Sequence, residues 1–163
     1  MGEVQSASVP VVVRPARPSD AQRLMEVARA ANTEYAGRWA LGALSDHLLD
    51  VVRDLENGFG FVALADGLCV GTIRCVVHDD GTGYLKRLAV LPGWRRFGIG
   101  TRLMIAAEDY LLKCGVVRAT LCSVAENASA TAFYRSRGYR VVELREDLAC
   151  GFTASMWEKN LRG

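Results

Sequence analysis

The chain has 163 residues, half of them hydrophobic and 23% charged, which is the size and composition of one globular domain with a single core rather than of a disordered segment. Its net charge of +2, without any run of five or six like charges, is too small to imply a nucleic-acid-binding protein, so we expect no nucleic-acid partner. No apolar run approaches the ~18 residues that span a bilayer, and the first residues do not resemble a secretory signal, so we expect no membrane partner and a cytoplasmic location.

The cysteines indicate neither a disulfide framework nor a metal site. They are odd in number, none belongs to a Cys-x-x-Cys pair, and most sit among apolar residues. We therefore predict reduced, buried thiols and no bound metal. The five are Cys69, Cys75, Cys114, Cys122 and Cys150.

The first half of the chain is predicted to combine two helices with a run of strands. Residues 1–8 are small and polar and are expected to form a loose tail, which leaves 9–163 as one domain. Asp66-Gly67 is a strong signal for a tight hairpin turn. The segment over 33–42, which carries Tyr35 and Trp39, is either a substrate loop or a plain connection between helices. The elements follow as a strand over 9–14, helices over 18–32 and 44–57, and strands over 59–65, 68–77 and 84–91.

The second half is predicted to contain a crossover between parallel strands. Its elements are a helix over 100–113, a strand over 116–124, a helix over 127–138, and strands over 139–144 and 152–158. Because a helix separates the strands 84–91 and 116–124, these two should run parallel with a right-handed connection. The predicted fold is mixed α/β, with a largely antiparallel central sheet of about seven strands and helices on both faces.

The loop between the strand over 84–91 and the helix over 100–113 has the features of an anion site. A helix N-terminus leaves about four backbone N–H groups unpaired and carries roughly half a positive charge. Gly98 and Gly100 remove side chains where an anion would approach the backbone. Arg95 and Arg96 add donors with the fork geometry that suits phosphate. The loop therefore predicts a diphosphate site.

Two well-known phosphate loops do not fit this stretch. A dinucleotide fingerprint requires a third glycine where Leu103 stands, and a Walker loop requires Gly-Lys-Ser/Thr, which the chain lacks. The spacing Arg95-x-x-Gly98-x-Gly100 instead resembles the acyl-CoA pyrophosphate loop of the GNAT superfamily of N-acetyltransferases. The segment over 127–139 is similar to that family's other signature, and the order of elements matches the family over nearly the whole chain.

The resemblance implies acetyl-CoA as the acyl donor and a bulged strand whose parallel neighbour splays away from it. In the family, the backbone of that strand pairs with the pantetheine arm, here through Leu88 and Val90. Tyr134 aligns with the tyrosine that protonates the departing thiolate, and Asn127 would bind the cofactor, cap its helix, or do both. The implied cofactor-binding residues are Leu88, Ala89, Val90, Arg95, Arg96, Phe97, Gly98, Ile99, Gly100, Thr101, Asn127 and Tyr134, with Tyr134 also the catalytic acid.

The base that takes the proton of the acceptor amine is not evident. A base matters because a lysine-like amine, with a pKa near ~10, is mostly protonated at pH 7. Many family members carry a glutamate near the position of Tyr84, but this chain has no carboxylate between Tyr84 and Trp94. Glu34, His78, Tyr84 and Glu126 are the candidates, directly or through water.

Three functions fit these observations. The first is an acetyl-CoA-dependent N-acetyltransferase that acts on a primary amine of a small or amino-acid-like molecule. The second is the same chemistry on a protein lysine or an N-terminal amine, which would require an open groove. The third is a non-catalytic acyl-CoA-binding sensor, against which the presence of Tyr134 argues. By analogy with the family, a homodimer is a further prediction.

Overall fold

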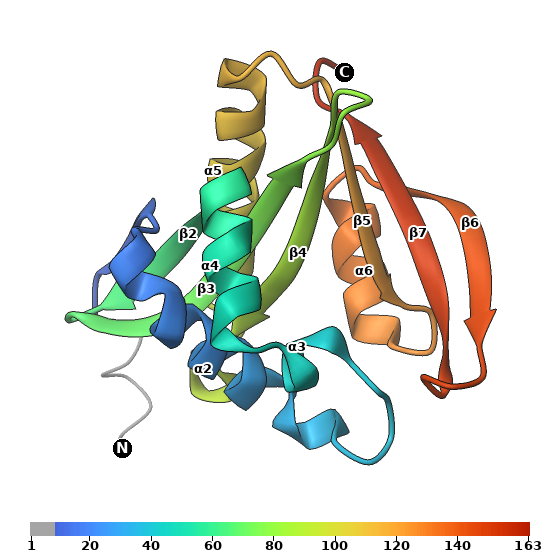
Figure 1. Ribbon diagram of the computed structural model, residues 1–163, viewed down its shortest axis with the longest axis horizontal. Coiled ribbons are helices and arrows are strands. Elements are labelled where there is room, and N and C mark those ends of the chain that lie inside the picture. Colours follow the sequence, from blue (N-terminus) through green and yellow to red (C-terminus); the bar gives the residue numbers. More distant parts are fainter. Residues whose placement is uncertain (1–8) are drawn as a thin grey trace.

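The protein is built around one seven-stranded sheet (Figure 1). The computed structural model describes residues 9–163, so the tail predicted over 1–8 lies outside the described residues. The strands are β1 (Val11–Pro15), β2 (Gly58–Ala65), β3 (Leu68–Val77), β4 (Thr82–Val90), β5 (Arg118–Val124), β6 (Arg140–Asp147) and β7 (Phe152–Asn160). Their order is β1-β2-β3-β4-β5-β7-β6, and every neighbouring pair is antiparallel except β4 and β5. The predicted mixed, largely antiparallel sheet is confirmed.

Helices cover both faces of this sheet, as predicted. They are α2 (Ala21–Asn32), α3 (Gly42–Ser45), α4 (Leu48–Asn57), α5 (Ile99–Lys113) and α6 (Ala128–Ser136), with 3-10 turns η1 (Pro18–Asp20), η2 (Thr33–Tyr35) and η3 (Pro92–Trp94). Side chains of a strand alternate between the two faces of its sheet. On β2, Val62 packs with residues of α2 and α4, whereas Phe61 and Ala63 pack with residues of α5. Apolar residues are therefore packed against both faces of the sheet.

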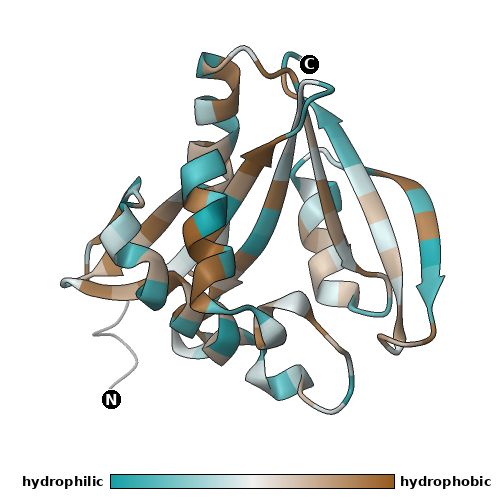
Figure 2. Ribbon diagram, in the orientation of Figure 1, coloured by the Kyte–Doolittle hydropathy of each residue, from teal (hydrophilic) through white to brown (hydrophobic). Residues whose placement is uncertain are grey.

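The distribution of hydropathy follows this layered arrangement. In Figure 2 much of the central part of the sheet is brown, and α4 shows both teal and brown turns, as a helix with one buried face should. Among the described residues, no helix combines the length and the apolar composition needed to cross a membrane.

The helix predicted over 44–57 is two helices, α3 and α4. The chain leaves the helical conformation at Asp46 and His47, which are extended. The carboxylate of Asp46 accepts hydrogen bonds from Arg74 on β3 and Arg87 on β4, contacts that a residue inside a continuous helix would not reach in the same way. Asp50, in the first turn of α4, then accepts a hydrogen bond from the amide of the N-cap residue His47 at 2.8 Å. Pairing with distant arginines thus separates the two helices.

The prediction of buried thiols is correct only for Cys69 and Cys75. All five cysteines are free, but Cys114 is exposed and Cys122 and Cys150 are partly exposed. Cys114 directly follows α5, and Cys150 lies in the turn between β6 and β7. Apolar neighbours in the sequence did not imply burial at these chain reversals.

β4 and β5 separate part-way along their length, and this divergence opens the sheet (Figure 1). Their parallel pairing ends at Leu85 opposite Leu121, although β4 continues to Val90. β4 also carries a bulge, because its register with β3 shifts and Arg87 has a φ of 57°. The last part of β4 is therefore left with one unpaired edge, as the resemblance implied.

Candidate functional site

The unpaired part of β4 forms one wall of a cleft of about 750 Å³. The other walls come from β5, the first turn of α5, α6 and the segment that joins α2 to α3. This volume lies within the ~300–1,000 Å³ of small-molecule and cofactor sites. Predicted site residues that line the cleft are Leu88, Ala89, Val90, Arg95, Arg96, Gly98, Ile99, Gly100, Thr101, Asn127 and Tyr134. Phe97 is absent from this lining, and its side chain is 45% exposed.

The N-terminus of α5 opens into the cleft without a side-chain cap. Gly98 is the N-cap residue, has a φ of 76° and offers no side chain to the first turn. Arg96 also has a positive φ, of 69°, so the loop turns twice through the left-handed region before the helix begins. The first intrahelical bond runs from the Arg102 amide to the Gly98 carbonyl at 3.0 Å. The earlier amides, up to Thr101, are the unpaired donors that attract an anion.

The two arginines of this loop have different roles in the structure. Arg95 donates from Nη1 to the Glu34 carboxylate and from Nη2 to the Ala31 carbonyl, both at 2.7 Å. Its Nε donates to the Val90 carbonyl at 3.2 Å. Arg95 therefore joins the C-terminal end of α2 to the end of β4. Arg96 makes no ion pair with the described residues and is exposed, so its guanidinium is the one available to a ligand.

The open edge of β4 presents backbone groups to the cleft. The Leu91 amide donates to the Val70 carbonyl of β3 at 2.9 Å, so the backbone of Leu91 points toward β3. Successive residues of an antiparallel strand point their backbone groups in alternate directions. The N–H and C=O groups of Leu88 and Val90 therefore point toward the gap between β4 and β5. The Val90 carbonyl already accepts a hydrogen bond from Arg95, so the free groups on this edge are the Val90 N–H and the N–H and C=O of Leu88.

Tyr134 projects from α6 into the same cleft. Its ring packs against those of Tyr139 and Trp157, at centroid distances of 6.2 and 5.9 Å. Its hydroxyl forms no hydrogen bond with residues 9–163, although it lines the cleft. Burial, with smaller contributions from Cys122 and Tyr84, raises the pKa of Tyr134 to about 12. The hydroxyl therefore stays protonated at neutral pH and can donate a hydrogen bond.

Asn127 is the N-cap of α6. Its Oδ1 accepts a hydrogen bond from the Ala130 amide at 3.1 Å, which is the helix-capping role considered from the sequence. Its Nδ2 donates to the Tyr35 hydroxyl at 3.4 Å, across the cleft. Both ends of the amide therefore have protein partners.

Of the four candidate bases, the cleft contains only Tyr84. Glu34 is bound to Arg95, and both carboxylate oxygens of Glu126 accept the Thr153 amide at 3.0 Å. His78 lies at the end of β3, with its ring 5.8 Å from that of Tyr84. Burial raises the pKa of Tyr84. A strong base is therefore absent from the described lining of the cleft.

The segment between α2 and α3 crosses from one side of the cleft to the other. Tyr35 and Trp39 stack at 4.9 Å between centroids, and both line the cleft. The Ala40 amide donates to the Cys150 carbonyl in the turn between β6 and β7 at 2.9 Å. Of the two alternatives considered from the sequence, the structure supports a segment that helps to form the site, with Trp39 also buried.

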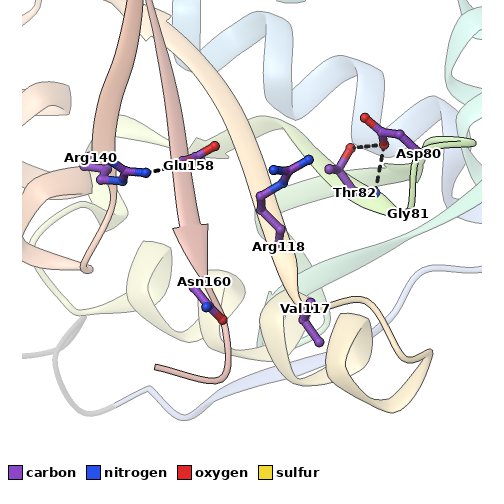
Figure 3. A pocket seen from close by; sticks show the side chains of 8 residues that line it. All are labelled: Asp80, Gly81, Thr82, Val117, Arg118, Arg140, Glu158 and Asn160. Atoms are coloured by element: carbon purple, nitrogen blue, oxygen red, sulfur yellow. Dashed lines mark hydrogen bonds and ion pairs between the residues drawn. The ribbon is translucent and has the colours of Figure 1, made fainter.

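A second hollow, of about 390 Å³, lies where β4 and β5 begin (Figure 3). Three of its four charged side chains already have partners: Arg140 donates to Glu158 at 2.7 Å, and Asp80 accepts from the amide and hydroxyl of Thr82 at 2.9 and 2.7 Å. It contains none of the predicted site residues. The larger cleft is therefore the candidate site.

Comparison with known proteins agrees with this geometry. The family model described as "Acetyltransferase (GNAT) family" matches residues 23–139. The chain belongs to this family. The resemblance noted in the sequence is thereby confirmed, and the match includes the loop before α5, β4 and α6.

Individual GNAT proteins match this chain over part of its length or at low sequence identity. The chain is 33% identical over 82 residues to N-alpha-acetyltransferase MAK3 of Arabidopsis thaliana, covering 48% of this chain and 43% of that protein. It is 33% identical over 85 residues to N-alpha-acetyltransferase 30 of Schizosaccharomyces pombe, covering 50% and 57%. The chain thus spans about half the length of these two relatives. A PaiA N-acetyltransferase from Thermoplasma acidophilum, solved in complex with coenzyme A, has a TM-score of 0.75 at 22% identity, over 93% of this chain and 99% of that one, and so shares the fold.

One charged residue of this GNAT cleft was not predicted. Arg87 lines the cleft at the bulge of β4, beside Tyr84. The only local feature that could have indicated Arg87 was the adjacent pair Lys86-Arg87. In a regular strand, alternation would place these two side chains on opposite faces of the sheet, without showing which of them faces the cleft. The bulge, which sequence spacing does not reveal, decides where Arg87 points.

Proposed function

We propose that this protein transfers the acetyl group of acetyl-CoA to a primary amine by direct attack of the amine on the thioester. One observation carries the proposal: the uncapped N-terminus of α5, the open edge of β4 and the unpartnered hydroxyl of Tyr134 meet in one cleft. Membership of the GNAT family supports it. We call the part of the cleft lined by Arg95, Arg96, the N-terminus of α5 and the open edge of β4 the donor end. The part lined by Leu41, Ala43, Tyr84 and Arg87 is the acceptor end.

The donor end fits a coenzyme A thioester. The amides from Ile99 to Thr101, with Arg96, would hold the diphosphate. The free backbone groups of Leu88 and Val90 would pair with the pantetheine amides as an added strand does. When bound, acetyl-CoA supplies the thioester carbon that the amine attacks.

The residues of the chain contribute orientation and protons to the transfer. An N–H on the open edge of β4 would donate to the thioester oxygen as negative charge develops there. The Tyr134 hydroxyl would donate a hydrogen bond to the departing sulfur, and the thiolate, with a pKa of about 8.5, then gains its proton from water by way of this hydroxyl. A tyrosine with a raised pKa is neutral and only a weak base, so Tyr84 is not expected to take the proton of the attacking amine itself. The amine would lose that proton to water, and Tyr84 would act as a hydrogen-bonding relay.

The acceptor end favours a small amine. The segment that carries Tyr35 and Ala40 is bonded to Asn127, the N-cap of α6, and to the turn between β6 and β7, so it crosses the cleft and limits access to this end. A lysine inside an extended peptide would require a groove that is open on both sides. The second candidate is the N-terminal amine of a protein, and the names of the two N-alpha-acetyltransferase relatives support it. The homodimer and the cytoplasmic location remain predictions.

Two measurements test this proposal. Acetyl-CoA should slow amide hydrogen exchange in residues 97–101, and absence of protection there would contradict the donor end. A library of primary amines, scored by release of free CoA thiol from acetyl-CoA, should then identify acceptors. Binding of acetyl-CoA with no turnover on any amine, including peptide N-termini, would favour the acyl-CoA sensor instead.

A further inference from the structure

The acceptor end carries a positive charge that acetyl transfer itself does not require. Arg87 lines it, and its side chain is 24% exposed. Within the described part of the chain, the cleft lining includes no aspartate or glutamate. A substrate therefore meets a cation at this end and no anion that would bind an ammonium group.

The guanidinium of Arg87 is held in one orientation, with one edge left free. Its Nε donates to Asp46 Oδ2 at 2.7 Å and its Nη2 to Oδ1 at 3.1 Å, so the two groups form a bidentate pair. An arginine has five N–H donors, of which this pair uses two. The Nη1 group makes no hydrogen bond with residues 9–163. One N–H of Nη1 and the second N–H of Nη2 therefore form a free edge of the guanidinium. The spacing of these two donors matches the two oxygens of a second carboxylate.

The surrounding structure is shaped around this guanidinium. Gly42, in the first turn of α3, lies against it so closely that a Cβ at this position would overlap Nη2. A side chain at position 42 would therefore require the guanidinium or the main chain of α3 to move. A fixed guanidinium loses little conformational entropy when it binds a ligand, which favours recognition.

The ion pairs around Arg87 leave positive charge unbalanced. Arg74 pairs with both Asp46 and Asp54, at 2.5 and 2.8 Å, and Lys86 pairs with Asp54 at 3.1 Å. Together with Arg87, three cations share two carboxylates. Arg74 is buried and Lys86 does not line the cleft, so the excess charge is available to a ligand through Arg87. In a partly buried site an opposite charge is attracted more strongly than in water.

We propose that Arg87 binds a carboxylate of the acceptor, so that the preferred substrates are small primary amines that carry a carboxyl group near the reacting nitrogen, as amino acids do. This inference rests on the proposed function, because it names the acceptor class of the same site. Arg87 is then a specificity-determining residue, and Asp46 is a positioning residue that acts through it. Amines without an anionic group would meet an uncompensated cation.

The test compares acceptors that differ only in the carboxylate. Rates of CoA release are measured for L-amino acids and for the matching amino-acid amides, with wild type, Arg87→Gln and Arg87→Lys. The ratio of kcat/KM for acid over amide should fall about 30-fold or more in Arg87→Gln, mainly through KM of the acid, as expected for loss of a charge-assisted bond. Arg87→Lys should lie between the two. Comparing ratios between variants cancels the different basicity of the two amines.

Arg118→Met is the matched control, because it removes one positive charge from an exposed residue of β5 that neither lines the cleft nor belongs to the ion pairs around Arg87. It should retain the wild-type ratio. Wild type that acetylates amides as well as acids, or Arg87→Gln that slows both equally, would overturn the inference while leaving the N-acetyltransferase activity established. Absence of transfer to every amine would instead defeat the proposed function. The same rates measured with peptides that begin with aspartate or with alanine show whether a side-chain carboxylate can replace the α-carboxylate of a free amino acid.

Discussion

The two ends of the cleft are constructed differently. The donor end consists mainly of backbone groups from the contiguous residues 95–101 and from the adjoining edge of β4. The acceptor end consists of side chains held by distant partners: Arg87 binds Asp46, 41 positions earlier, and nearby Tyr35 binds Asn127, 92 positions later. A backbone site depends on local conformation, whereas a side-chain site depends on tertiary contacts. Substitutions should therefore affect the two ends in separable ways.

Tyr134 lies where the two ends meet and should give the largest effect. Tyr134→Phe should reduce kcat about 100- to 1,000-fold, as expected for loss of a general acid, with the Kd for acetyl-CoA unchanged. Because the pKa of Tyr134 is raised to about 12, the wild-type rate should show no loss from its ionisation below about pH 10. Tyr139→Phe, which removes a hydroxyl bonded to Glu108 outside the cleft, is the control and should keep kcat. A full rate in Tyr134→Phe would remove this hydroxyl from the mechanism.

Asp46 tests the acceptor end alone. Burial raises the pKa of Asp46, but hydrogen bonds from Arg87 and Arg74 outweigh that effect and leave the pKa below its ordinary value. Its ionised form therefore stabilises the fold above pH ~4, and this contribution is lost as the pH falls through the lowered native pKa. Asp46→Asn should lower the free energy of unfolding by about 3 kcal/mol at pH 7, and by less at pH 3, in urea titrations.

The control for Asp46 is Asp109→Asn, because Asp109 is exposed and has no ion pair with the described residues. It should change the free energy of unfolding by less than about 0.5 kcal/mol. Acetyl-CoA affinity should stay at the wild-type value in Asp46→Asn. A loss of acetyl-CoA affinity in Asp46→Asn would show that the two ends are coupled. It would contradict the expectation that substitutions affect the donor end and the acceptor end separately.

Two glycines at opposite ends of α5 test the donor end. Gly98 and Gly115 flank the helix, have φ of 76° and 82°, and have open space where a Cβ would stand. Alanine at either position should cost roughly 1–2 kcal/mol of stability, because of the left-handed backbone. Only Gly98→Ala should also weaken acetyl-CoA binding, by about tenfold measured by calorimetry, because its Cβ would obstruct the anion site. Equal affinities in the two variants would place the diphosphate elsewhere.

The smallest effect is expected at Glu34, on the rim of the donor end. Its pair with Arg95 is exposed, at 48% and 39% of the side chains, so solvent screening limits its value. Glu34→Gln should reduce stability by no more than about 0.5 kcal/mol in thermal melts and change kcat by less than about twofold. A tenfold fall in kcat with a lost pH dependence would instead identify Glu34 as the base.

Local sequence was sufficient to predict most of the fold. The strand over 68–77 agrees with β3 at both ends, and the hairpin at Asp66-Gly67 forms with φ of 50° and 79°. The loop before α5 was also predictable, because Gly98 acts through a left-handed backbone conformation, which is a local property of the chain. Periodicity, turn residues and helix ends are properties of short segments, so they are visible without knowledge of the folded chain.

Tertiary structure decided the remaining features. It divided the helix predicted over 44–57, because Asp46 turns toward arginines of two strands, and it directed Arg95 to Glu34 and to carbonyl groups of α2 and β4. It also placed Arg87 in the cleft by means of a bulge. The sequence by itself therefore determined the sheet, its covering helices and the donor end, whose backbone donors depend on local conformation. The acceptor end was decided only when distant side chains met, because ion pairs and bulges depend on which strands become neighbours.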